Sequence, residues 1–284
     1  MLVAVAAITY GMFGDPLAPV LLHLDLGEAC SHPGCPPVTE IWARSWQADV
    51  YLLVGGIVVG VAAGLAGATF CATRPRSLAT RAVESAGMVL YSLPVYLFGF
   101  GVLLLFEPSF GALPLPVFFH PLDYEAPLED PWRFVEAMVV PWLVIGLPFA
   151  AVVMRLAQAA MLEELDADYV RTAAAKGLSR RQVVRRHAGR PARVSVASLI
   201  GTWVPTFVTN MVLVEFVFFV PGFFGQTKRA LGQIPELPPG FDIPMLQGLA
   251  LWAAVLIVAT SALADLVLVM LDPRVRSSAA GPAG

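Results

Sequence analysis

Five long runs without charged residues divide the chain, at 50–72, 85–106, 137–154, 194–214 and 243–264. Each reaches or approaches the roughly 20 apolar residues that a helix needs to cross a bilayer. Residues 1–14 are also apolar but shorter, and they lack the basic start and the small-residue cleavage site of a signal peptide. The pattern predicts an all-α polytopic membrane protein of about six transmembrane helices, with the first one short or truncated.

Composition and charge placement support this prediction. The chain is 57% hydrophobic and 14% charged, whereas a soluble domain has roughly 45–50% apolar and about 25% charged residues. If Met1 is cytoplasmic, only four of the 18 Lys and Arg residues lie in outer segments: Arg44, Arg133, Lys228 and Arg229. Cytoplasmic loops carry the excess of basic residues, so we expect a multi-pass protein of the plasma membrane with both termini cytoplasmic.

A polar, basic segment, 163–196, separates the fourth and fifth predicted spans. Asp166 is a candidate N-cap, and small or apolar residues follow it at helical spacing up to Ala174. Gly177 allows a left-handed turn, after which Ser179 and Gln182 form a capping-box pattern for a second helix. The segment predicts a helix–Gly–helix elbow whose smooth face suits docking onto another protein.

Residues 168–179, DYVRTAAAKGLS, resemble the cytoplasmic EAA loop of bacterial ABC-importer permeases, most closely those of the dipeptide/oligopeptide (peptide/nickel) branch. In that family the loop implies a coupling helix that sits in a groove of the ATPase subunit. The signature glycine corresponds to Gly177, and Pro191 stands where the family has none. The resemblance implies an ATPase-coupling surface of Asp168, Tyr169, Arg171, Thr172, Ala173, Ala174, Lys176 and Gly177.

Further motifs resemble the same family in the same order along the chain. They are Gly14-Asp15-Pro16, Leu24-Asp25-Leu26-Gly27, Ser92-Leu93-Pro94, the stretch VEFVFFVPGF at 214–223, Asp242–Gly248 and Asp272-Pro273-Arg274. In the family the region of the Ser-x-Pro motif lines the translocation path, which implies that role for Ser92 and Pro94. The external segment between Gly14-Asp15-Pro16 and Leu24-Asp25-Leu26-Gly27 is much shorter than in the family.

Glu215 is an ionisable residue at the edge of a span, which makes it a functional candidate by default. It either orders the Pro221-Gly222 turn by accepting backbone hydrogens or meets a cationic part of the substrate, and we favour the ordering role. Asn210 lies five residues earlier and is expected to add a polar contact.

The glycines Gly56, Gly60 and Gly64 share one helix face, which predicts close helix packing rather than a pore role. Cys71 is expected to be a small packing residue. Cys30 and Cys35 flank a Pro-Gly turn in the outer loop, where a disulfide, free thiols or a metal site all stay open.

The resemblance implies the permease subunit of a bacterial ABC importer, forming half of the translocation pathway and most closely suited to di- or oligopeptides. Its partners would be a second permease (a heterodimer), two ATPase subunits, an external substrate-binding protein and the bilayer. The chain itself has no phosphate-binding loop and no protease or hydrolase signature. We therefore expect no enzyme activity and no cofactor. We also expect no metal beyond the open question at Cys30 and Cys35, and no nucleic acid, because the basic elbow is short and accompanied by acidic residues.

Alternatives remain at this point. The same family includes permeases for nickel or another small solute. An ion-coupled secondary transporter would use Glu215 and Asp265, and an accessory protein would rest its basic elbow on anionic lipid. The expected organisation is a first helix and outer loop at 1–48, a permease core with five helices at 49–276, and a disordered tail at 277–284.

Overall fold

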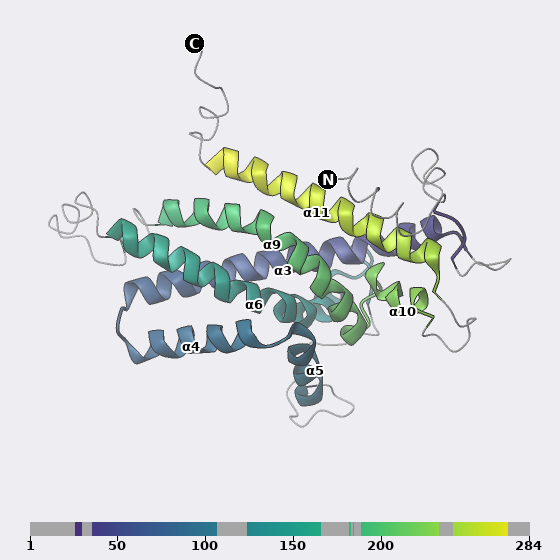
Figure 1. The fold of residues 1–284 in the computed structure, drawn as a ribbon. Coiled ribbons are helices and arrows are strands. Elements are labelled where there is room, and N and C mark those ends of the chain that lie inside the picture. Colours follow the sequence, from purple (N-terminus) through teal and green to yellow (C-terminus); the bar gives the residue numbers. More distant parts are fainter. Residues whose placement is uncertain are drawn as a thin grey trace, which may run out of the picture.

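The computed structural model describes residues 26–29, 36–106, 124–165, 182, 184, 189–232 and 241–271, and all of its regular elements are helical apart from one isolated β-bridge between Glu28 and Pro37. Four long helices run along the molecule, and the shorter α4 lies beside α6 (Figure 1). The elements are α3 (Val38–Thr73), α4 (Leu78–Ser92), α5 (Val95–Phe106), α6 (Pro131–Leu165), α9 (Gly189–Phe218), η3 (Phe224–Gln226), α10 (Thr227–Ala230) and α11 (Ile243–Leu271).

Helices α3, α6, α9 and α11 are each long and apolar enough to cross a membrane. The all-α polytopic membrane fold predicted from the uncharged runs is therefore confirmed. The short first helix at 1–14 and the elbow between the fourth and fifth spans lie outside the described residues, so the expected total of about six helices stays a prediction.

The run 85–106 is not one continuous helix, in contrast to the simple pattern of uncharged residues. Helix α4 ends at Ser92, α5 begins at Val95, and the two axes differ by 108°. Leu93 is extended, with φ −80° and ψ 129°. Pro94 explains the break, because it lacks an N–H group and disfavours helical geometry at the residue before it.

Side-chain caps fix where two of the long helices begin. Oδ1 of Asp130 accepts the backbone hydrogens of Trp132 and Arg133 at 3.0 and 3.1 Å, at the start of α6. Asp242 does the same for the N–H of Met245 in α11, at 3.1 Å. Part of the acidic character of the loops that precede α6 and α11 therefore serves helix capping.

The glycine face of α3 packs directly on α6. A Cβ atom at Gly60 would lie 2.5 Å from Cδ1 of Phe149 and 3.0 Å from the carbonyl oxygen of Gly146. On the facing helix, a Cβ at Gly146 would lie 2.7 Å from the carbonyl oxygen of Gly56. We call this contact, with Gly64 next along it, the glycine seam. The predicted packing role of these glycines is confirmed.

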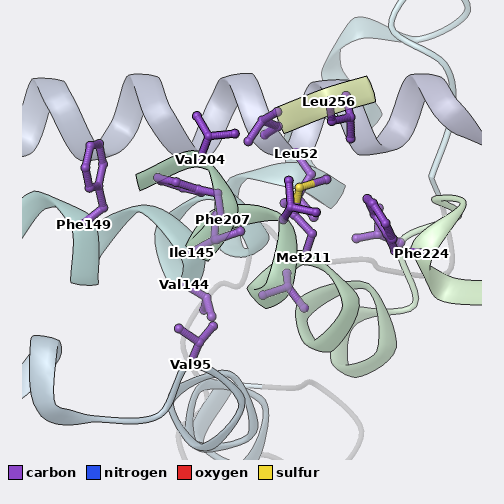
Figure 2. Packing of buried hydrophobic residues seen from close by; sticks show 14 of the residues in the cluster. Leu52, Val95, Val144, Ile145, Phe149, Val204, Phe207, Met211, Phe224 and Leu256 are labelled. Carbon is purple, nitrogen blue, oxygen red and sulfur yellow. The ribbon is translucent and has the colours of Figure 1, made fainter. Parts of the chain in front are cut away.

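Large apolar side chains fill the space beside the seam. Figure 2 shows Leu52, Ile145 and Phe207 converging between α3, α6 and α9. The rings of Phe149 and Phe207 meet edge to face at 5.1 Å between centroids, a favourable aromatic geometry. Cys71 is buried in this core, as its expected packing role requires.

Candidate functional site

The chain reverses direction directly after α9. Phe219 has a positive φ of 54°, which ends the helix in the left-handed region. Val220, Pro221 and Gly222 follow without regular structure, and the N–H of Gly222 donates to the carbonyl oxygen of Val220 at 2.8 Å. The chain then enters η3 and α10. We call residues 219–226 the outer turn, a name that follows the orientation predicted from the basic loops.

Two carboxyl groups from distant helices hold the outer turn. Asp49 of α3 accepts the backbone hydrogen of Phe223 on Oδ1 at 2.9 Å and the indole hydrogen of Trp252 of α11 on Oδ2 at 2.6 Å. Glu215 of α9 accepts the backbone hydrogen of Gly225 on Oε2 at 2.6 Å. These hydrogen bonds tie three membrane helices to one turn. We call Asp49, Glu215, Trp252 and the turn residues they hold the carboxyl cluster.

Gly222 lies between the two carboxyl groups. A Cβ atom at this position would overlap Oδ1 of Asp49 and Oε2 of Glu215. The glycine is therefore required by close approach of the backbone to the two side chains. Pro221, one residue earlier, is exposed and lies outside this contact.

The carboxyl cluster is closed to solvent. Asp49 is 0% and Glu215 1% exposed. Trp252 also contacts Trp42, with ring centroids 5.4 Å apart. Nearby, in the loop before α6, burial is the main cause that raises the pKa of Tyr124 to about 12, with contributions from Tyr51 and Asp49. Tyr124 is therefore neutral at physiological pH.

The geometry of Glu215 bears on the two roles expected for it. Its bond to the Gly225 N–H is the contact that an ordering role needs, and its burial leaves no surface for a cationic substrate in this conformation. Asn210, one and a half turns earlier, is half-buried on α9 and does not belong to the cluster.

A second arrangement lies on the open face of α9. Exposed residues recur there at helical spacing. Between residues 198 and 209 every exposed residue except Pro205 carries a hydroxyl group: Ser198, Thr202, Thr206 and Thr209. We call these four the hydroxyl stripe. Thr202 donates to the carbonyl oxygen of Leu199 at 2.9 Å, and Thr209 to that of Pro205 at 3.0 Å. A hydroxyl that donates to its own helix still presents an acceptor oxygen outward.

The break between α4 and α5 lies close to this stripe. Tyr91, at the end of α4, contacts the ring of Trp203 at 6.4 Å between centroids, and Trp203 follows Thr202 in α9. Ser92 and Pro94 are both exposed at the break. Tyr91 also lines a groove of about 410 Å³ between α4 and α6, together with Met88 and Arg155. The structure thus leaves Ser92 and Pro94 exposed at the break, while Glu215 and Gly222 belong to the buried cluster.

The remaining expected positions lie outside the described residues. They are the whole coupling segment from Asp168 to Gly177 and both cysteines of the outer loop, Cys30 and Cys35. In the part of the chain that the structure does describe, no three His, Cys, Asp or Glu side chains gather as a metal site would require.

Sequence reasoning missed Asp49, Trp252 and the hydroxyl stripe. Asp49 was visible as the charge that begins the 50–72 run, and Thr202, Thr206 and Thr209 recur at spacings of four and three within the 194–214 run. The position of Asp49 and the spacing of the Thr residues could have identified both as candidates. Neither pattern indicates which residues they contact in the fold.

Comparison with known proteins places the chain among transport components. A family model described as "Binding-protein-dependent transport system inner membrane component" matches residues 56–277. The dipeptide transport system permease protein DppB of Escherichia coli (strain K12) is 29% identical over 276 residues, covering 90% of this chain and 78% of that protein. DppB of Haemophilus influenzae is 31% identical over 242 residues, with 79% and 67% covered. A probable peptide ABC transporter permease protein of Sinorhizobium fredii, y4tP, is 28% identical over 240 residues, with 84% and 72% covered.

Proposed function

Since this chain belongs to the family of binding-protein-dependent transport system inner membrane components, we propose that it forms half of the translocation pathway of a bacterial ABC importer for di- or oligopeptides. The chain is a multi-pass permease component and not an enzyme, because the ATPase of such importers is a separate subunit. The peptide substrate is proposed from the names of the relatives, two of which are dipeptide transport permeases.

The observation that carries this proposal is the hydroxyl stripe. A helix face that meets lipid is expected to be apolar, as on α11, where Leu263, Leu266 and Met270 are exposed. The open face of α9 instead presents hydroxyl oxygens within a membrane-spanning helix. Such oxygens accept hydrogen bonds from the N–H groups of a peptide. We therefore assign the translocation path to this face.

The neighbouring break between α4 and α5 completes the proposed path. Ser92 and Pro94 are exposed there, and Tyr91 links the break to α9 through Trp203. A helix interrupted inside the membrane is tolerated where it lines a water-filled cavity or is buried in protein. In this proposal Asn210 borders the path, whereas Glu215, Pro221 and Gly222 shape the outer turn.

The partners follow from the family. Binding-protein-dependent transport implies an ATPase and a substrate-binding protein. We further propose a second, homologous permease that covers the hydroxyl stripe from the opposite side, and two ATPase subunits that dock on the segment from Asp168 to Gly177. This docking requires the orientation expected from the basic loops, with both termini in the cytoplasm. Residues 49–276 would then act as the permease core.

The test is uptake of a labelled dipeptide into proteoliposomes that contain the co-purified complex. Thr209→Val removes one acceptor from the stripe without changing the shape of the side chain. Loss of one hydrogen bond of about 1 kcal/mol predicts an uptake rate that falls roughly three- to ten-fold. Thr209→Ser, which keeps the hydroxyl, should stay close to wild type.

Thr69→Val is the matched control. Thr69 of α3 also donates to a carbonyl oxygen four residues earlier, that of Leu65, at 2.8 Å, but lies off the stripe. Equal uptake by the Thr69 and Thr209 variants would contradict the assigned path. Accumulation of labelled Ni²⁺ instead of dipeptide would favour the nickel branch, and uptake driven by an ion gradient without ATP would contradict the importer itself.

A further inference from the structure

The hydrogen bonds of the carboxyl cluster leave one oxygen atom without a donor. Three of its four carboxyl oxygens accept an N–H group: Oδ1 and Oδ2 of Asp49, and Oε2 of Glu215. The fourth, Oε1 of Glu215, is buried and receives no hydrogen from any N–H or hydroxyl group of the described residues. A buried polar atom in this state destabilises the fold unless something else satisfies it.

The two carboxyl groups contact one another. Oδ1 of Asp49 and Oε2 of Glu215 both border the position that a Cβ atom of Gly222 would occupy. An ionised carboxylate only accepts hydrogen bonds, so a bond between two carboxyl groups needs a proton on one of them. Within the described residues, no Lys or Arg forms an ion pair with either group. Two adjacent buried negative charges would therefore repel each other without compensation.

The hydrogen-bond inventory also identifies which group is the acid. Asp49 already accepts hydrogens on both oxygens, whereas Glu215 has one oxygen free of donors. We propose that Asp49 and Glu215 form a proton-binding site, in which Glu215 carries the proton and shares it with Asp49, which stays an anion. One proton taken up from the extracytoplasmic side neutralises one of two charges. The remaining charge is met by the N–H groups of Phe223 and Trp252 and by the hydroxyl of the Glu215 acid.

The site has a structural consequence at the outer face of the membrane. The proton joins α9 to α3, and the Asp49 anion joins α3 to α11 and to the outer turn. Loss of the proton would put two charges beside Gly222 and separate the turn from α3. This proton site does not involve the transported substrate. A result that contradicts the proton site therefore leaves the proposed function untouched, and the reverse also holds.

Isosteric amides at the two positions give an asymmetric prediction. Gln at 215 is neutral and still donates to Asp49, so in the purified complex Glu215→Gln should keep the apparent melting temperature within about 2 °C of wild type. Asn at 49 turns an NH₂ group toward a site where three donors converge. Asp49→Asn should therefore lower the melting temperature by roughly 4–10 °C, from the cost of unsatisfied buried groups.

Infrared spectroscopy tests the proton itself and does not need a stable Asp49 variant. The wild-type protein should show the carbonyl band of a protonated carboxyl group, shifted in D₂O, and Glu215→Gln should remove it. Glu84→Gln is the matched control, because it makes the same change outside the carboxyl cluster, where Glu84 accepts an amide hydrogen from Gln158 at 2.9 Å. The band should survive this substitution.

Three results would overturn the proposal. The first is the absence of a protonated-carboxyl band that depends on Glu215. The second is equal destabilisation by the two amides, which is expected if both groups are ionised around a cation. The third is a melting temperature that depends on Na⁺ or Ca²⁺ and falls with a chelator, which would identify a metal ion in place of the proton.

Discussion

Helix α3 contacts the rest of the chain in two different regions, the glycine seam and the carboxyl cluster. In the seam α3 packs closely on α6 because its contact face consists of glycines. A Cβ at Gly60 would lie 2.5 Å from Phe149. The cluster lies nearer the N-terminal end of the same helix, where Asp49 binds the outer turn and Trp252 through directed hydrogen bonds.

The difference shows how one helix serves two demands inside a membrane. Between helices in lipid, association relies on close van der Waals packing, which small residues permit. A turn that leaves the helical ladder needs partners for its backbone N–H groups, because unsatisfied groups are costly away from water. The seam therefore fixes how near two helices come, and the cluster fixes where an irregular segment lies.

The largest effect is expected in the cluster. Gly222→Ala would make a Cβ overlap Oδ1 of Asp49 and Oε2 of Glu215. Overpacking and broken hydrogen bonds add, so the loss of stability should exceed about 3 kcal/mol and much of the protein should fail to fold. Monodisperse yield after detergent extraction is the measurement.

Gly225→Ala is the control for that prediction, since it makes the same change in the same turn. Its Cβ would lie 3.4 Å from the carbonyl oxygen of Val220, an ordinary contact, and its N–H stays available to Glu215. If both variants were recovered in wild-type yield, close approach at Gly222 would not be a requirement of the fold.

The next largest effect is expected from a substitution in the glycine seam. Gly60→Ala should lower stability by about 3 kcal/mol, because the added methyl group meets both Phe149 and the backbone of Gly146. The apparent melting temperature in detergent measures it. Gly101→Ala in α5 has nothing within 4 Å of its Cβ and should be neutral or gain up to about 1 kcal/mol from helix propensity. Identical shifts for the two variants would argue against the seam.

The smallest effect compares two indole hydrogen bonds. Trp252→Phe leaves Oδ2 of Asp49 without its donor and should cost about 2 kcal/mol, because the acceptor is charged. Trp142→Phe removes a bond of 2.9 Å to the backbone oxygen of Tyr51, a neutral acceptor, and should cost about 1 kcal/mol. A reversed order of the two melting temperatures would contradict the ionised state assigned to Asp49.

Features carried by neighbouring residues could be predicted from the sequence. The uncharged runs located the long helices, because the length of bilayer to be crossed is fixed. The seam was predictable because Gly56, Gly60 and Gly64 repeat every four residues on one helix. Pro94 indicated a disturbance in its span, although the 108° change of direction depends on how α5 packs against α9.

The carboxyl cluster could not be predicted in the same way. Asp49 meets Phe223 and Trp252 across 174 and 203 residues of sequence, so no local pattern joins them. The Thr residues of α9 were visible at helical spacing, but only the packing of α9 against its neighbours determines which face stays open. The segment from Asp168 to Gly177, assigned by resemblance, stays a prediction.

The most direct test of the account is affinity purification of the tagged full-length chain from its native membrane, followed by mass spectrometry of the proteins that accompany it. We predict recovery of a second permease together with ATP-binding subunits, and of a substrate-binding protein that identifies the transported solute. Recovery of the chain alone, folded and monodisperse, would contradict its role as the permease subunit of an ABC importer.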